Sequence, residues 1–334
     1  MSPDSTSDKK TSLEADQPLW LAFAAFSAIS LVVASVILSL LIGFYTSPQA
    51  VGLFLILPYY TYTLSLGRWE MNDGNRWLEF SKNFWLFRIG RRHLQLQFLK
   101  PCKELVDAEM APQAQFMITL FPHGTSADYR VLMDGVMNEV FPNVHCHIRT
   151  LAATVLFRLP LVREVALWTG CIDARRSVAE AALAKGRTVM VVPGGEAEQI
   201  RTTHGQEMVY LSRRQGFLKL AMRHNVPVVP AYVFGVSDYY YTSHLFFGCR
   251  EWLRKRFGVC IPLAAGLWGS PACPLPVKTT IVFGKPLSFP MKDSGSPSQE
   301  EVDLAHETFC AELKKLFDEH KGEVGYRDRE LSML

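Results

Sequence analysis

The longest hydrophobic segment of the chain lies near its N-terminus, where residues 19–44 contain no charged side chain. A polar stretch, residues 1–18, precedes it and predicts a disordered cytosolic tail. A helix of this length covers roughly 39 Å at about 1.5 Å per residue, more than the ~30 Å hydrocarbon core of a bilayer. The pattern therefore favours a transmembrane helix over the alternative, a buried core helix followed by a strand.

A second apolar run covers residues 51–67 and follows a short uncharged turn that contains Pro48. Pro58 and several tyrosines interrupt this run, so crossing the bilayer and re-entering from the same side are both compatible with it. Lys9 and Lys10 precede the two runs, and a series of arginines and lysines follows them. Because positively charged flanks stay in the cytosol, residues 19–67 predict a membrane hairpin with both ends cytosolic.

The next segment, residues 68–112, mixes Trp and Phe with Arg and Lys. Two interpretations are open: an amphipathic region at the lipid headgroups, or ordinary connecting helices.

Beyond this segment, apolar runs alternate with amphipathic ones, and residues 113–325 predict a single α/β domain. Strands are predicted at 115–121, 145–151, 187–193, 226–234 and 278–283. Helices are predicted at 178–186, with Ser177 as N-cap and Gly186 as C-cap, at 217–224 and at 299–321. The last helix places one set of apolar residues on a single face: Val302, Ala305, Phe309, Leu313, Leu316 and Phe317. This alternation favours a largely parallel sheet flanked by helices.

Composition narrows the classes of function. The formal net charge is only +3, so a nucleic-acid partner is not expected. The seven cysteines form no C-x-x-C pair, which argues against a metal site or a redox motif and suits reduced thiols facing the cytosol.

The first candidate for chemistry follows the strand at 115–121. Phe121-Pro122-His123-Gly124 stands at its end, and Asp128 completes an H-x4-D pair. A neutral imidazole is suited to take a proton from an alcohol that attacks a thioester, and a carboxylate behind it would fix the tautomer. Gly124 would leave room for a substrate. His123 as an ordinary satisfied polar residue is the alternative.

Two more candidates follow in the chain. Gly194 and Gly195, with Glu198 three residues on, come after another strand, where backbone N–H groups could face an oxyanion or substrate; a tight turn is the alternative. Arg213 and Arg214 precede a helix, and either they bind the phosphates of CoA or they are simply solvated.

Several well-known signatures are absent from the chain. It contains no G-x-S-x-G, no P-loop, no G-x-G-x-x-G and no H-E-x-x-H. Serine hydrolases, nucleotide hydrolases, dehydrogenases and zinc proteases are therefore disfavoured.

In this order, the motifs resemble the type 2 family of diacylglycerol acyltransferases and their monoacylglycerol and wax-alcohol relatives. That family has a membrane hairpin followed by H-P-H-G, G-G-x-x-E, R-K-G-F, V-P-x-x-x-F-G and G-K-P. The counterparts here are Phe121-Pro122-His123-Gly124, then Gly194, Gly195 and Glu198, then Arg214-Gln215-Gly216-Phe217, then residues 229–235, and finally Gly284-Lys285-Pro286. The likeness extends over residues 20–325.

The chain departs from the family pattern at Phe121, Gln215, Val236 and Ser237, which replace a His, a Lys, an acidic residue and an Asn. These differences suggest a divergent branch and leave His123 in place. The H-x4-D pair is also similar to that of glycerolphosphate acyltransferases, and the resemblance implies a fold like theirs.

The resemblance implies an acyl-CoA:diacylglycerol O-acyltransferase of triacylglycerol biosynthesis, with acyl-CoA as co-substrate and no cofactor or metal. It places the enzyme in the endoplasmic reticulum membrane, or at lipid droplets, with a cytosolic catalytic domain and a possible homo-oligomeric state. Monoacylglycerol, a long-chain alcohol or a lysophospholipid are alternative acceptors. An inactive lipid-binding scaffold is the alternative from a different class.

Overall fold

The computed structural model of the chain describes residues 17–258, 260–291 and 295–334. The predicted tail, residues 1–18, lies almost wholly outside them. A seven-stranded sheet occupies the centre, in the order β1-β10-β7-β2-β5-β3-β4. Its strands are β1 (Gln97–Phe98), β2 (Met117–Phe121), β3 (Arg149–Ala152), β4 (Cys171–Asp173), β5 (Val189–Val191), β7 (Val228–Phe234) and β10 (Thr280–Phe283). Only β10 and β7 pair antiparallel, so the predicted largely parallel sheet is confirmed.

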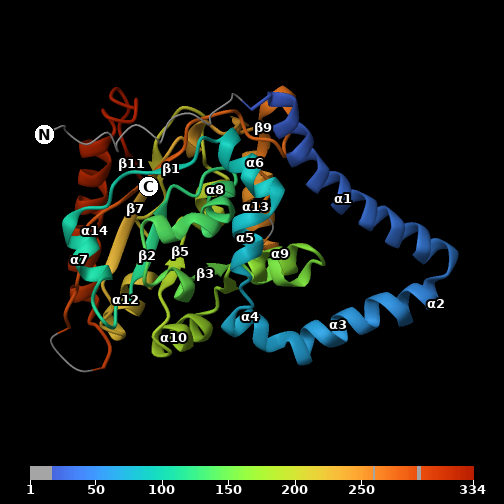
Figure 1. The fold of residues 1–334 in the computed structure, drawn as a ribbon, viewed down its shortest axis with the longest axis horizontal. Helices are drawn as coiled ribbons and strands as arrows, with labels where there is room; N and C mark the ends of the chain where they lie inside the picture. Colours follow the sequence, from blue (N-terminus) through green and yellow to red (C-terminus); the bar gives the residue numbers. More distant parts are fainter. Residues whose placement is uncertain (1–16, 259, 292–294) are drawn as a thin grey trace, which may run out of the picture.

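Helices cover both faces of this sheet (Figure 1). One face packs against α10 (Arg176–Ala184), α12 (Gly216–Arg223) and α14 (Gln299–His320). The other packs against α6 (Trp85–His93), α7 (Lys103–Glu109) and α8 (Asp128–Met133). Along β2, Met117 and Phe121 join the first core, whereas Ile118 and Leu120 join the second. Because both faces are buried, the central strands are apolar throughout.

Two sequence predictions need correction. The strand predicted at 145–151 begins only at Arg149, because residues His145–His147 form a 3-10 turn, η4. Helix α10 begins at Arg176, so Ser177 lies inside the helix and is not its N-cap. The Oδ1 atom of Asp173 accepts the backbone N–H of Arg175 at 2.8 Å and so fixes the chain just before the helix. The C-cap of α10 is Lys185, and Gly186, predicted in that role, follows it with φ +72°, the left-handed conformation that commonly ends a helix.

The last helix agrees closely with its prediction. Ser298 and Glu301 form a capping box at the start of α14. Its buried residues are the predicted set: Val302, Ala305, Phe309, Leu313, Leu316 and Phe317.

The N-terminal apolar runs project from one side of the domain as two limbs that meet at a turn (Figure 1). The first limb is α1 (Leu19–Thr46); the second comprises α2 (Pro48–Val51), the π-helical η1 (Gly52–Ile56) and α3 (Leu57–Leu64). By length and composition, α1 is a candidate membrane span. The second limb qualifies only together with the segment Leu66–Asp73, across a 47° bend. One apolar N-terminal helix is thus shown, and a second crossing is not.

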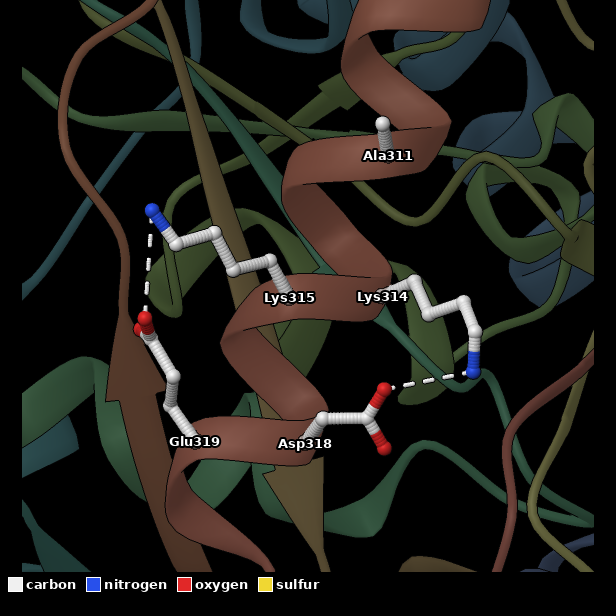
Figure 2. A pocket seen from close by; sticks show the side chains of 5 residues that line it. All are labelled: Ala311, Lys314, Lys315, Asp318 and Glu319. Atoms are coloured by element: carbon white, nitrogen blue, oxygen red, sulfur yellow. Dashed lines mark hydrogen bonds and ion pairs between the residues drawn. The ribbon is translucent and has the colours of Figure 1, made fainter.

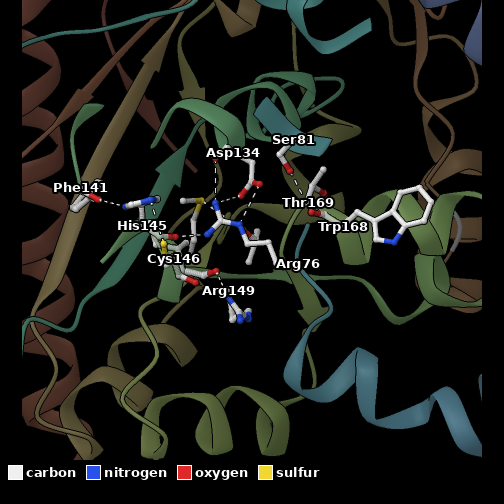
Figure 3. Close-up of polar contacts among 12 residues, drawn as sticks. Arg76, Ser81, Asp134, Phe141, His145, Cys146, Arg149, Trp168 and Thr169 are labelled. Atoms are coloured by element: carbon white, nitrogen blue, oxygen red, sulfur yellow. Dashed lines mark hydrogen bonds and ion pairs between the residues drawn. The ribbon is translucent and has the colours of Figure 1, made fainter. Parts of the chain in front are cut away.

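Residues 68–112 fold onto the domain as η2 (Leu66–Trp69), α4 (Glu70–Asp73), α5 (Leu78–Asn83), α6, β1 and α7. Figure 3 shows the guanidinium of Arg76 beside Asp134 and His145. Its Nη2 lies 3.0 Å from Asp134 Oδ1, with both side chains buried, and its Nη1 donates to the carbonyl of His145. Much of this segment is therefore part of the packed domain, although Trp77 and Trp85 remain exposed.

Two small sheets and several short helices complete the chain. β6 (Met208–Val209) pairs in parallel with β11 (Ser332–Met333), and β8 (Tyr241–Ser243) pairs antiparallel with β9 (Leu263–Ala265). Helix α13 (Phe247–Phe257) connects β8 to β9. The remaining helices are η3 (Asp134–Glu139), η5 (Thr154–Arg158), α9 (Val162–Trp168), α11 (Gly195–Gln199), η6 (Val236–Asp238) and η7 (Leu267–Gly269).

Candidate active site

Three of the predicted motifs meet at one edge of the sheet. Strands β2, β5 and β7 are parallel neighbours, so their carboxyl ends point the same way. His123, Gly194 and Gly235 each follow one of these ends. Ligands of open α/β sheets usually bind at the carboxyl edge of the strands.

The side chain of His123 is partly buried in the loop after β2, and its Nδ1 lies 3.0 Å from the carbonyl oxygen of Gly124. A carbonyl oxygen only accepts hydrogen bonds, so Nδ1 carries the proton and Nε2 keeps its lone pair. Within the described part of the chain, Nε2 has no hydrogen-bond partner. Burial lowers the pKa of His123, and the hydrogen bond to Gly124 opposes this. The imidazole is therefore a neutral base at neutral pH.

Asp128 lies nearby but bonds to other groups. Its Oδ1 accepts from the hydroxyl of Ser126 at 2.8 Å, and its Oδ2 accepts from Tyr240 at 3.1 Å. Burial raises its pKa, and these two hydrogen bonds lower it. Among the residues that the structure describes, no hydrogen bond joins Asp128 to His123, so the Gly124 carbonyl holds the tautomer in place of the expected carboxylate. A catalytic role of Asp128 stays a prediction.

Glu198 connects two separate segments of the site. Its Oε1 accepts the backbone N–H of His123, and its Oε2 accepts that of Tyr210 at 2.7 Å. The side chain is 1% exposed. Burial raises the pKa of Glu198 to about 7, while these hydrogen bonds and the charge of Arg214 lower it. Because its two oxygens accept from backbone donors of two segments, Glu198 positions the loop that carries His123. A substrate-binding role of Glu198 stays a prediction.

The surroundings and backbone conformation that favour glycine differ among the three glycines of the site. A Cβ on Gly194 would lie 2.2 Å from Glu198 Oε2, so this glycine makes room for the carboxylate to fold back. A Cβ on Gly124, whose φ is +68°, would lie 2.2 Å from Val236 Cγ1. The space expected for a substrate at Gly124 is thus occupied by Val236. Gly195 has φ +52° and open space around it, and it begins α11.

The two arginines lie in different surroundings. Arg213 is exposed. The Nη2 of Arg214 lies 3.3 Å from the carbonyl of Gly194, and its guanidinium lies 5.5 Å from the ring of Tyr210. Its Nε is buried without a hydrogen-bond partner among the described residues. Arg214 therefore borders the site, whereas Arg213 points to solvent.

Sequence reasoning missed the C-terminal segment as part of this site. The backbone carbonyl of Leu334 accepts from Leu211 and Ser212 at 2.8 Å, directly beside Tyr210. The guanidinium of Arg329 lies 2.8 Å from the fully buried Glu207 and 2.9 Å from Asp238. No local motif marks these residues, because Arg329 contacts Asp238 across 91 positions and Glu207 across 122. Tyr240, which donates to Asp128, is a further residue of the site. The signal that could have identified it is the run of three tyrosines, 239–241, shortly after the Phe234-Gly235 motif.

Two surface hollows lie away from these residues. One, of about 530 Å³, runs along the exposed face of α14 beside Ala311 and the ion pairs Lys314–Asp318 and Lys315–Glu319 (Figure 2). A second, of about 410 Å³, lies around residues 111–115 and 143–147.

In residues 17–258, 260–291 and 295–334, no cluster of three or more His, Cys, Asp or Glu is arranged to hold a metal ion.

Comparison with known proteins adds to this geometry. A family model described as diacylglycerol acyltransferase matches residues 57–333. Human acyl-CoA wax alcohol acyltransferase 2 is 30% identical over 312 residues, 86% of this chain and 91% of that protein. Diacylglycerol O-acyltransferase 2 of Xenopus tropicalis is 27% identical over 278 residues, which cover 77% of this chain and 73% of that protein. The human protein of that name is 28% identical over 275 residues, which cover 77% of this chain and 68% of that protein. The family match runs from α3 to β11 and so includes the motif residues of the site from His123 to Arg214.

Proposed function

We propose a function from the premise that this chain belongs to the diacylglycerol acyltransferase family: it esterifies diacylglycerol to triacylglycerol. The coarser activity, acyl transfer from acyl-CoA in lipid biosynthesis, is that of its relatives. One observation carries the chemical part of the proposal: His123 is a neutral imidazole with a free Nε2 at the carboxyl edge of the central strands. A fold like that of glycerolphosphate acyltransferases is part of the same proposal.

The acceptor is the least constrained part of the proposal. The names of the relatives include both diacylglycerol and wax alcohol acyltransferases, at similar identity. We propose diacylglycerol because the family model carries that description across residues 57–333. A long-chain alcohol, monoacylglycerol or lysophospholipid is the competing acceptor.

In the proposed mechanism, Nε2 of His123 takes the proton of the acceptor hydroxyl as its oxygen attacks the thioester carbonyl carbon. The resulting tetrahedral oxyanion collapses, and the carbon–sulfur bond breaks. The CoA thiolate then takes the proton from His123, which leaves an ester, free CoA and a neutral imidazole. Because the thioester is already activated, no covalent enzyme intermediate is needed, and the protein contributes positioning and proton transfer.

Two further roles are proposed around this base. The backbone N–H of Gly195 begins α11 and has no partner within that helix, so it is our candidate donor to the oxyanion. Arg214, whose buried Nε lacks a partner among the described residues, and the exposed Arg213 are our candidates to bind the acyl-CoA. Glu198 holds the loop that presents His123.

We also propose that residues 19–67 form a multi-pass hairpin in the endoplasmic reticulum membrane, with the domain in the cytosol and access to lipid droplets. The apolar α1 and the basic residues after the second run support this proposal. On the family resemblance alone, a homo-oligomeric state is also part of the proposal.

Expression in cells that lack neutral-lipid synthesis tests the function. Triacylglycerol should accumulate with the wild type and not with His123→Ala at equal protein level. Accumulation of wax ester instead would assign a long-chain alcohol as acceptor. If membranes containing the protein form no ester from labelled acyl-CoA with any acceptor, the chain is a lipid-binding scaffold and the proposed activity is wrong.

A further inference from the structure

Large apolar side chains are exposed in a part of the chain outside the hairpin. Between β8 and η7 the structure exposes Tyr241, Leu245, Phe246, Trp252, Phe257, Ile261 and Trp268. Phe246 is 77% exposed and Trp252 is 57% exposed. A concentration of exposed aromatic residues in one segment marks a binding surface more often than a solvated one.

The orientation of this surface is set by the inner face of α13. Arg250 is buried and donates to the carbonyls of Ser243 and Leu245, before α13, and of Ile261, after it. These bonds hold the chain on both sides of α13 to the helix. Glu251 is 3.0 Å from Arg201, which itself donates to the carbonyl of Ala197 in α11. Helix α13 is therefore tied to the helix that contains Glu198.

The outer face of α13 carries Cys249, Trp252 and Arg256, at positions that share one side of a helix. All three are exposed, and Lys255 is exposed beside them. Helices that lie in a membrane interface combine Trp and Phe, which sit at the headgroup level, with basic residues that face lipid phosphates. The exposed composition of α13 fits that surface.

The position of this segment relative to the hairpin points to the same partner. Near its root, α1 contacts η7, where the rings of Phe23 and Trp268 are 4.9 Å apart. At the other root, the hydroxyl of Tyr60 in the second limb donates to the carbonyl of Arg158, and Leu159 and Leu161 nearby are exposed. Both limbs therefore leave the domain beside exposed apolar residues, and the Phe23–Trp268 contact places α1 against the segment that follows α13.

We propose that α13 and its flanking loops are a second membrane contact, lying in the headgroup region of the bilayer that the hairpin enters. The proposal rests on the proposed function, because the acceptor is a lipid of that membrane. The links from Glu251 through Arg201 to α11 then hold His123 and its loop close to the bilayer surface, where the hydroxyl of an acceptor lipid resides.

Two exposed cysteines allow a direct test on the full chain. Cys249 lies on the outer face of α13, whereas Cys146 is exposed in η4, outside α13 and its flanking loops. A fluorophore is attached to Cys249 in a Cys146→Ser background, and to Cys146 in a Cys249→Ser background. Each protein is reconstituted into vesicles of phosphatidylcholine with anionic phosphatidylserine. Nitroxide-labelled lipids should quench the Cys249 probe several-fold more than the Cys146 probe. Equal quenching of both probes would overturn the proposal, whether or not the protein transfers acyl groups.

A functional arm uses Trp252→Ser/Phe257→Ser, with Leu304→Ser as the matched control because Leu304 is an exposed apolar residue on α14. The double variant should stay inserted through the hairpin but show a several-fold higher apparent KM for acceptor lipid in vesicles. Its kcat with a water-soluble short-chain acceptor should be unchanged. Unaltered KM for the vesicle acceptor would contradict the membrane contact, whereas absence of any transfer by the wild type would contradict the proposed function.

Discussion

The imidazole of His123 leads to a prediction about activity. His123→Ala should lower kcat by about 10²–10⁴-fold while acyl-CoA still binds, because general-base catalysis contributes about that much. Asp128→Asn should be milder, since an amide keeps one oxygen to accept from Ser126 or Tyr240. His147→Ala, at an exposed histidine, is the control. Turnover by a folded His123→Ala variant within a few-fold of wild type would make His123 structural.

The same residue predicts the pH dependence. Burial lowers the pKa of His123, so the base is still neutral at a pH where a free imidazole, with a pKa of about 6.5, is half protonated. Activity should therefore persist down to the lowered pKa and fall only below it. A pH profile of kcat/KM measures this limit, and an acid midpoint above about 6.5 would contradict the assignment.

Glu198 leads to a prediction about positioning. In Glu198→Gln, one of the two backbone donors, His123 N–H or Tyr210 N–H, would face an amide N–H₂ group in place of an oxygen. Leaving a buried donor unpaired costs about 1–3 kcal/mol, so both unfolding temperature and kcat should fall. Glu196→Gln, two residues away and without these contacts, should behave like the wild type. Wild-type activity of Glu198→Gln would show that catalysis does not depend on the link that Glu198 makes between His123 and Tyr210.

The arginine pair predicts an effect on acyl-CoA binding. The double variant Arg213→Ala/Arg214→Ala should raise KM for acyl-CoA by about tenfold, as expected for loss of a hydrogen bond between charged groups. Arg214→Ala alone should also reduce kcat, because Arg214 contacts the carbonyl of Gly194. Arg176→Ala, at an exposed ion pair on α10, is the control. An unchanged KM in the double variant would exclude this pair from CoA binding.

Among the elements, the C-terminal strand β11 has the least expected role. It pairs with β6, and the carbonyl of Leu334 accepts two backbone N–H groups next to Tyr210. Deleting residues 332–334 removes these bonds, so the Tyr210–Glu198–His123 chain of contacts should loosen, and activity should fall along with thermal stability. Leu334→Ala keeps the backbone and should retain most activity. If the deletion leaves both activity and stability unchanged, β11 does not support the site.

The arrangement of the whole molecule predicts its topology. In sealed microsomes, added protease should digest residues 100–334, because the basic residues after the second apolar run keep the domain in the cytosol. Deleting residues 19–66 should weaken membrane retention but not abolish it, since α13 would still contact the bilayer. Protection of residues 100–334 from protease would show that the topology is reversed.

The pattern of the sequence determined the elements and the family. Alternating apolar runs and amphipathic helices predicted the parallel sheet and the buried face of α14. A helix buried on one side has apolar residues at helical spacing, and a strand buried on both faces is a continuous apolar run, so both are visible in the sequence. The long uncharged segment predicted α1, and the ordered motifs around His123, Gly194 and Arg214 predicted one site. One miss also has a local explanation: Arg175, not Ser177, is the N-cap of α10, and its backbone N–H donates to Asp173.

Only the tertiary structure decided what each site residue touches. Glu198 reaches His123 across 75 positions, and Tyr240 reaches Asp128 across 112, so no local pattern reveals either contact. The Gly124 carbonyl, and not Asp128, fixes the tautomer of His123, and Val236 fills the space beside Gly124. The reason is physical: a periodic pattern reports burial, whereas hydrogen bonds depend on distances between segments that only the packed fold brings together.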